Sequence, residues 1–237
     1  MLERRISILV GHFGSGKTEI ALNLALRLAA RRDDVVLVDL DVVKPYFRSR
    51  SAREFVAGRG VRLVAPDGEL AHADLPIVLP EVRRVIADPG CRVLIDAGGD
   101  PVGARVLGSL ADVMPADDAE LLAVLNFRRP STGSAAEAVA MIREIEAASR
   151  LAVAGLISNT HLLGETTVEI VRRGLELARE TGERLGVPVV AVGADEATAA
   201  ALAGDEFGCP VVTLARLIAP PFAPYARRRV GPVFALN

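Results

Sequence analysis

Residues 11–18 combine three glycines with a lysine and a threonine at a spacing suited to binding phosphate. The stretch reads Gly11-His12-Phe13-Gly14-Ser15-Gly16-Lys17-Thr18, which matches the pattern G-x-x-x-x-G-K-[ST]. Glycines let backbone N–H groups approach phosphate oxygens, and a helix starting after them adds partial positive charge. Lys17 can supply a cation to the β- and γ-phosphates, and the Thr18 hydroxyl can bind Mg²⁺. We therefore expect a nucleotide-binding loop rather than a glycine-rich turn.

The residue after this loop separates it from a dinucleotide-binding turn. A dinucleotide fingerprint needs a third glycine three residues after the second. Glu19 stands at that position, so the pattern is incomplete. We count the whole stretch from Gly11 to Glu19 as nucleotide-binding.

Aspartates follow two apolar runs where they could complete a magnesium site. Asp39 ends the run at 35–39 and Asp41 follows two residues later, while Asp96 ends the run at 92–96. Carboxylates in this position bind Mg²⁺ directly or through water, although an aspartate at a strand end can also simply cap the next loop. Given the phosphate loop, we predict Thr18, Asp41 and Asp96 as the metal-binding residues.

Short apolar runs alternate with longer helical patterns along the chain. The predicted strands cover residues 6–10, 35–39, 62–64, 92–96, 121–125, 152–158 and 187–192, with 211–212 as a short edge strand. The predicted helices cover residues 17–30, 51–57, 79–87, 102–110, 134–148, 166–185 and 196–203. Continuous apolar strands joined through helices indicate a parallel sheet covered on both faces. We predict an α/β fold with a doubly wound, mostly parallel sheet of seven or eight strands, and ligands at its carboxyl edge.

The composition is that of a globular chain. It has 237 residues, 51% hydrophobic and 24% charged, without a linker or repeat. We predict one domain over residues 1–237, ending in a Pro- and Arg-rich tail at about 219–237. The net charge of −2 gives no indication of nucleic-acid binding, and no apolar run approaches the ~18 residues of a membrane span. Two unpaired cysteines and no recognisable signal peptide favour a cytoplasmic location.

Taken together, the motifs resemble the MinD/ParA/nitrogenase-iron-protein class of P-loop NTPases, which also holds dethiobiotin synthetase and the cobyrinate diamide synthases. The resemblance rests on the phosphate loop, Asp39-Leu40-Asp41, Asp96-Ala97-Gly98-Gly99 and Leu156-Ile157-Ser158-Asn159, with Val192-Gly193-Ala194-Asp195-Glu196 near the end. It implies that Asn159 reads adenine and that Gly193, Ala194 and Asp195 close over the base. One departure concerns the signature lysine of MinD/ParA members, because His12 stands at its position.

The resemblance also implies segments that respond to the γ-phosphate. The candidate switch residues are Asp39, Lys44, Gly98, Gly99 and Asp100. Lys44 is the only lysine besides Lys17, and we expect it to sense phosphate in its own subunit or across a dimer, with a basic surface loop as the alternative. Residues 126–132 follow the fifth strand and could bind a second substrate or cap a helix. His72 and His161 are interpreted as ordinary loop residues.

These patterns predict a protein that binds ATP with Mg²⁺ and hydrolyses it slowly, as a switch or as an accessory or maturation factor. Lys17 would stabilise charge on the transferred phosphoryl group and Asp41 would orient the attacking water. A homodimer and an unidentified protein or small-molecule partner are expected. The alternative is an ATP-dependent ligase that activates a carboxylate, which the missing signature lysine favours.

Overall fold

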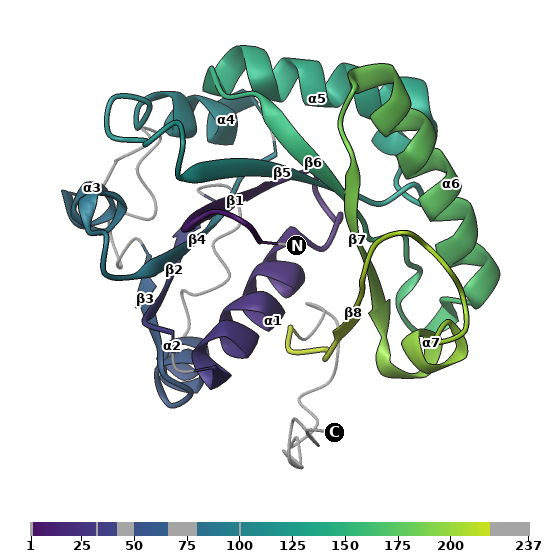
Figure 1. Ribbon diagram of the computed structural model, residues 1–237, viewed down its shortest axis with the longest axis horizontal. Helices are drawn as coiled ribbons and strands as arrows, with labels where there is room; N and C mark the ends of the chain where they lie inside the picture. The colour runs from purple at the N-terminus through teal and green to yellow at the C-terminus, as the bar shows by residue number, and fades with distance from the viewer. Residues whose placement is uncertain (1, 32, 42–49, 66–79, 100, 219–237) are drawn as a thin grey trace.

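The computed structural model describes residues 2–31, 33–41, 50–65, 80–99 and 101–218. Within them, eight strands form one sheet in which every neighbouring pair is parallel. The strand order is β3-β2-β4-β1-β5-β6-β7-β8 (Figure 1). The strands are β1 (Ile6–Val10), β2 (Val35–Leu40), β3 (Val61–Val64), β4 (Arg92–Ala97), β5 (Ala119–Leu125), β6 (Val153–Ser158), β7 (Val189–Asp195) and β8 (Val211–Leu214).

Helices cover both faces of this sheet, as Figure 1 shows. They are α1 (Lys17–Ala30), α2 (Arg50–Ala57), α3 (Pro80–Ala87), α4 (Pro101–Gly108), α5 (Ala135–Ser149), α6 (Val168–Leu185) and α7 (Glu196–Ala201), with short 3₁₀ turns at Pro130–Thr132 and Leu163–Glu165. One core lies between the sheet and α3, α4, α5 and α6, and a second lies between the sheet and α1 and α2. The central strands β1 and β2 are buried along their whole length. Burial on both faces explains why these strands are continuous apolar runs.

The predicted doubly wound parallel sheet is therefore confirmed, and β1 and α1 have the predicted bounds. Strand β7 covers Val189–Asp195 instead of the predicted residues 187–192, so it begins two residues later and ends three residues later. The backbone N–H of Val187 donates to the Gly182 carbonyl at 3.0 Å, so Val187 belongs to the end of α6, and Pro188 has no N–H to donate. The predicted tail at 219–237 lies outside the described residues.

Strand β1 lies at the point where the chain changes direction across the sheet. The connections from β1 lead through β2 to the β3 edge, and the later strands continue on the other side from β5 to β8. Ligands of open α/β sheets bind beside such a point, at the carboxyl ends of the strands. The end of β1 is where residues 11–16 begin, so the topology directs attention to the phosphate loop.

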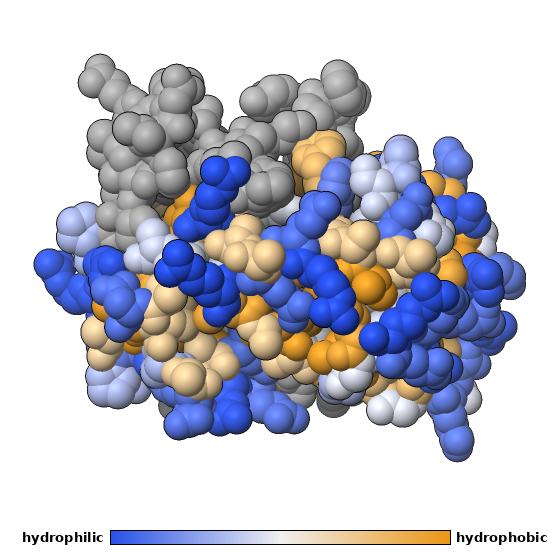
Figure 2. Space-filling model, turned by 90° about the horizontal axis from the view of Figure 1, so that it is seen from above, coloured by the Kyte–Doolittle hydropathy of each residue, from blue (hydrophilic) through white to orange (hydrophobic). Residues whose placement is uncertain are grey.

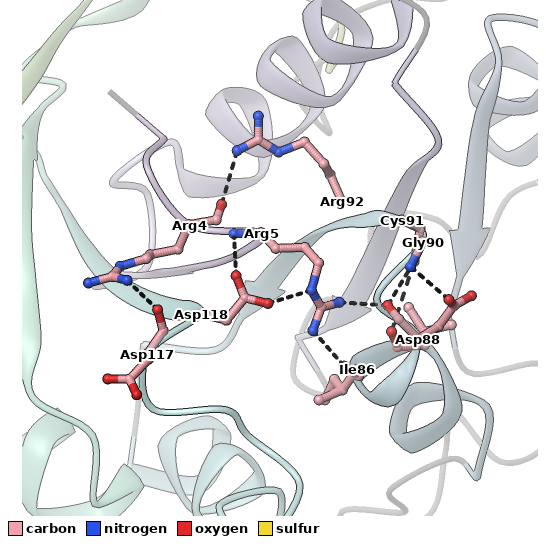
Figure 3. A network of polar contacts seen from close by, with 10 residues as sticks. Arg4, Arg5, Ile86, Asp88, Gly90, Cys91, Arg92, Asp117 and Asp118 are labelled. Carbon is pink, nitrogen blue, oxygen red and sulfur yellow. Dashed lines mark hydrogen bonds and ion pairs between the residues drawn. The ribbon is translucent and has the colours of Figure 1, made fainter.

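The amino edge of the sheet carries a network of polar contacts around Arg5 (Figure 3). The Arg5 Nε donates to Asp118 at 2.6 Å, while its two Nη atoms donate to the carbonyls of Asp88 and Ile86 at 2.7 and 3.0 Å. These contacts join the start of β1 to the segment before β5 and to the end of α3. The network lies at the opposite edge from the phosphate loop, so its role is structural.

The outer surface is mixed in character. In Figure 2, hydrophilic side chains are interspersed with smaller apolar areas over the face that α4 and α5 present. Among the described residues, no helix has both the length and the apolar character needed to cross a membrane.

Candidate functional site

The phosphate loop connects β1 to α1 at the carboxyl edge of the sheet. Gly16 precedes α1 with a φ of 87°, a left-handed conformation that glycine adopts without strain. A Cβ atom at Gly16 would lie 2.3 Å from the Asn159 amide nitrogen, and a Cβ at Gly99 would lie 1.8 Å from the Gly11 carbonyl oxygen. The small residues therefore let the loops after β4 and β6 approach the phosphate loop from its two sides.

Lys17 and Asp41 form a buried ion pair at this edge. The Lys17 Nζ lies 3.1 Å from Asp41 Oδ2, and the two residues are 6% and 9% exposed. The backbone N–H of Asp41 donates to Asp39 Oδ1 at 3.0 Å, which shapes the turn after β2. The first turn of α1 and the end of β2 therefore hold a cation and a carboxylate side by side.

Asp96 lies on β4 in register with Asp39 of β2 and is 1% exposed. Neither of its carboxylate oxygens accepts a hydrogen bond of ordinary geometry. Burial raises the pKa of Asp96 to about 6, although nearby Lys17 and the Thr18 hydroxyl act to lower it. A buried carboxylate without donors fits a cation site, because Mg²⁺ takes one or two carboxylates together with phosphate oxygens and water. Thr18, Asp41 and Asp96 are therefore suited to the metal role predicted for them.

A cavity of about 620 Å³ lies beside these residues, within the range of cofactor sites. Its walls include the phosphate loop, the end of β2, the loops after β5 and β6, the end of β7 and the segment after β8. The predicted site residues that line it are Phe13, Gly14, Gly16, Lys17, Thr18, Glu19, Asp41, Asn159, Gly193, Ala194 and Asp195. Gly11, His12 and Ser15 belong to the loop but do not line this cavity.

Asn159 and Asp195, both predicted to lie near a base, also form hydrogen bonds with the protein backbone. The Asn159 Nδ2 donates to the Ser15 carbonyl at 2.7 Å, and its Oδ1 lies 2.4 Å from where a Cβ of Gly193 would be. Asp195 caps α7, since its carboxylate accepts the N–H of Thr198 at 2.8 Å. Asn159 thus joins the phosphate loop to the end of β7 along one wall of the cavity.

The loop after β5 contacts the phosphate loop, which the sequence patterns left undecided. The Gly14 carbonyl accepts from Asn126 Nδ2 at 3.3 Å and from Arg129 Nε at 2.9 Å. Asn126 is 1% exposed, and its amide also contacts the backbone of His161 and Arg128. Arg129 lines the cavity. In the sequence, the only indication that Asn126 and Arg129 reach the phosphate loop was their position directly after a parallel strand.

His161 was interpreted as an ordinary loop residue, but it lines the cavity. Burial, together with the nearby charges of Arg129 and Arg216, lowers the pKa of His161 to about 4. The imidazole is therefore neutral at pH 7. His161 has no metal-ligand spacing in the sequence, so only its place two residues after Asn159 could have indicated this position.

Other predicted residues fall elsewhere. Lys44, His72 and Asp100 lie outside the described residues. Asp39 and Gly98 are buried and do not line the cavity. Among the residues that the structure describes, no three His, Cys, Asp or Glu side chains form a complete metal site, so a magnesium ion would need oxygens from Thr18 and from a bound nucleotide or water.

Comparisons with known proteins agree with the loop and the fold. A sequence model of the Zeta toxin family matches residues 3–96, which is less than half of the chain. A search of curated proteins gave no match.

Several solved structures of FtsY have a similar fold. The cell division protein FtsY of Thermotoga maritima is 22% identical with a TM-score of 0.55, and the match covers 81% of this chain and 62% of that one. The signal recognition particle receptor FtsY of Elizabethkingia anophelis, in complex with GDP, is 24% identical with a TM-score of 0.52, covering 84% and 59%. FtsY of Mycoplasma mycoides is 20% identical with a TM-score of 0.51, covering 83% and 63%. This chain therefore matches less than two thirds of each FtsY chain.

The parallel sheet, the phosphate loop and these comparisons define a P-loop nucleotide-binding fold. At 20–24% identity the likeness to FtsY concerns the fold alone. The narrower resemblance to the MinD/ParA class stays a hypothesis from the sequence motifs.

Proposed function

We propose that this chain binds Mg·ATP in the cavity and hydrolyses it slowly, as a nucleotide-dependent switch or as an accessory or maturation factor. The observation that carries the proposal is the buried Lys17–Asp41 pair beside Asp96, whose oxygens accept no hydrogen bond of ordinary geometry. Lys17 is the first residue of α1, and the amino end of a helix favours phosphate. An ion pair and a bare carboxylate are costly to bury, and a phosphate with its cation would satisfy both.

Each residue has a separate role in this proposal. Thr18, Asp41 and Asp96 would hold Mg²⁺, which would supply positive charge to neutralise the phosphates. Lys17 stabilises the negative charge that builds up on the transferred phosphoryl group, and Asp41 orients the attacking water. The water oxygen forms a bond to the γ-phosphorus as the bond to the ADP oxygen breaks, giving ADP and phosphate. Positioning and charge do most of this work, so few reactive side chains are needed.

Analysis of the products tests the reaction type. The protein is incubated with Mg·ATP alone, and nucleotide and phosphate are measured over many hours. An ATPase releases ADP and phosphate in equal amounts without any added substrate. Tight binding without release would indicate a switch with negligible turnover.

Two other reactions would give different products. A ligase that activates a carboxylate would release phosphate only when an acid is added, and the histidine at the signature-lysine position favours this alternative. A phosphotransferase would form ADP without free phosphate once its acceptor is present. The Zeta toxin match over β1–β4 is a reason to test also for phosphate transfer to an acceptor.

We propose adenine as the preferred base. Asn159 is followed by Thr160-His161-Leu162 instead of the K-x-D that reads guanine in GTPases. An asparagine amide can both donate to and accept from adenine, even with one hydrogen already bound to the Ser15 carbonyl. The FtsY of E. anophelis was solved with GDP, so GTP is the relevant competitor. Equal or tighter binding of GTP in a competition experiment would refute the adenine preference.

We further propose a protein partner, with homodimerisation in the ATP-bound state as the first case to examine. Phe13 and Leu163 are the two large hydrophobic side chains that are clearly exposed in the described chain, at 63% and 47%, and both line the cavity. Sedimentation with ATP and with ADP tests a nucleotide-dependent dimer. Association independent of nucleotide, or none at all, would contradict it.

A further inference from the structure

Three side chains of α1 hold the backbone of residues 213–218, the segment that runs from the end of β8 and that we call the β8 wall. Glu19, Asn23 and Arg27 are spaced by four residues, so they lie on one face of the helix. All three bind main-chain groups of the wall, at Thr213, Ala215, Leu217 and Ile218. The wall therefore takes its position from α1 in addition to the sheet.

The central anchor is Asn23, which is 1% exposed. Its Oδ1 accepts the N–H of Ala215 at 2.8 Å, and its Nδ2 donates to the Ala215 carbonyl at 2.9 Å. Arg27 donates to the Thr213 carbonyl one turn further along the helix. These contacts leave little freedom for the first half of the wall.

Glu19 holds the second half. Its carboxylate accepts the N–H of Leu217, and it accepts the N–H of Ile218 at 3.3 Å through Oε1 and 3.2 Å through Oε2. Charge-assisted bonds of this kind are stronger than bonds between neutral groups. Glu19 directly follows the phosphate loop, so a residue in the first turn of α1 also fixes residues 217 and 218.

The β8 wall forms part of the lining of the cavity through Leu214, Arg216 and Ile218, and Gly193 and Ala194 line it as well. Apart from Arg216 these residues are apolar, which suits a planar base, whereas the phosphates belong at Lys17 and Thr18. The two halves of a nucleotide would thus meet different parts of the protein.

We propose that Glu19 is a positioning residue that sets affinity for the base half of the nucleotide by holding the β8 wall. The inference rests on the nucleotide binding proposed above and goes beyond it, because the sequence motifs placed Glu19 only among residues that contact nucleotide. A positioning role and direct contact with nucleotide differ in consequence. Arg27 lies ~12 Å further along α1. Only a positioning role of Glu19 predicts that loss of the Arg27 side chain also weakens ATP binding.

Calorimetry with Mg·ATP and with Mg·tripolyphosphate separates the two halves. In Glu19→Ala we expect ATP affinity to fall about tenfold or more, because the anchoring bonds are lost, with tripolyphosphate affinity within about twofold of wild type. Glu19→Gln should recover part of the loss, since its amide oxygen can accept one N–H. Arg27→Ala should weaken ATP binding in the same direction but less. Arg31→Ala removes an exposed charge at the C-cap of α1 and serves as the matched control.

Several results would overturn the positioning role. Equal loss of ATP and tripolyphosphate in Glu19→Ala would place Glu19 at the phosphates or the metal. Loss in Glu19→Ala with wild-type ATP binding in Arg27→Ala would indicate direct contact with the base or ribose. Wild-type binding in both variants would end the inference while the proposed function stands. Absence of ATP binding by the wild-type protein would instead refute the proposed function.

Hydrogen exchange gives a readout independent of nucleotide. In Glu19→Ala the amides of Leu217 and Ile218 should exchange faster, while those of β1 stay protected as in wild type. Unchanged protection of residues 217 and 218 would show that Glu19 does not hold the wall.

Discussion

Asp96 is a buried carboxylate, and its burial destabilises the nucleotide-free protein when the group is ionised. Its oxygens have no hydrogen-bond donors of ordinary geometry, and its pKa is raised chiefly by burial. We expect Asp96→Asn to stabilise the nucleotide-free protein at pH 8 by about 1–2 kcal/mol, because it removes a buried charge. The same change should abolish the Mg²⁺-dependent part of ATP binding. Urea unfolding and calorimetry with and without Mg²⁺ measure the two effects, and a less stable variant with intact Mg²⁺ dependence would contradict this view of Asp96.

His161 makes the stability of the nucleotide-free protein depend on pH in a predictable way. Its pKa is about 4 in the folded chain, below the ordinary 6.5, mainly because it is buried. Between these values the unfolded chain binds the proton and the folded chain does not, so stability falls as the pH falls from 6.5 to 4. The full loss is about 3 kcal/mol. We expect His161→Gln to flatten this part of a stability–pH curve measured by urea unfolding, and a curve of unchanged slope would contradict the assignment.

At the residue scale, the sequence predicted the groups whose chemistry is tied to a motif. Lys17, Thr18, Asp41 and Asp96 lie close together because the loop and two parallel strands bring them to one edge, while their roles toward nucleotide and metal stay predictions. Arg129, His161 and Arg216 were not predicted as a group. They stand on three separate segments, and only the folded chain shows that they share a cavity.

The loop after β5 matters at the scale of elements, because it ties the phosphate loop to the loop after β6 through Asn126. We expect Asn126→Ala to lower the free energy of unfolding by about 2–3 kcal/mol, since buried backbone groups lose their partners. Nucleotide affinity should fall with it, because the Gly14 carbonyl loses a donor. Urea unfolding and calorimetry give both numbers. The exposed neighbour Arg128 is the control, and Arg128→Ala should change stability by less than ~0.5 kcal/mol. Equal effects of the two substitutions would contradict a special role for Asn126.

The elements themselves were largely predictable. Continuous apolar runs identified the buried strands, and their alternation with helices required parallel crossovers. The bounds were least certain at the sheet edge, where β8 has four residues in place of the two expected. Its last residues, Thr213 and Leu214, gain order from α1 and from β7, a contact between distant segments that local patterns do not contain.

Across the whole molecule, the proposed nucleotide site and the Arg5 network lie at opposite edges of the sheet. The Arg5 network at the amino ends of the strands should affect stability alone (Figure 3). We expect Arg5→Ala to lower the free energy of unfolding by about 2 kcal/mol, because several carbonyl and carboxylate groups lose a donor. ATP affinity, measured by calorimetry below the melting temperature, should stay as in wild type. A folded Arg5→Ala protein with clearly weaker ATP binding would show that the two edges are coupled.

We propose above that the cavity at the amino end of α1 binds a nucleotide through Lys17. Calorimetric titration of Mg·ATP into wild type and Lys17→Ala tests it most directly, with thermal melting to verify that the variant is folded. We predict binding by wild type and a loss of about 2–4 kcal/mol of binding free energy in Lys17→Ala, by analogy with removing a preorganised charge contact. No other lysine lies in the phosphate loop to replace it. Unchanged ATP affinity in a folded Lys17→Ala protein would contradict the account.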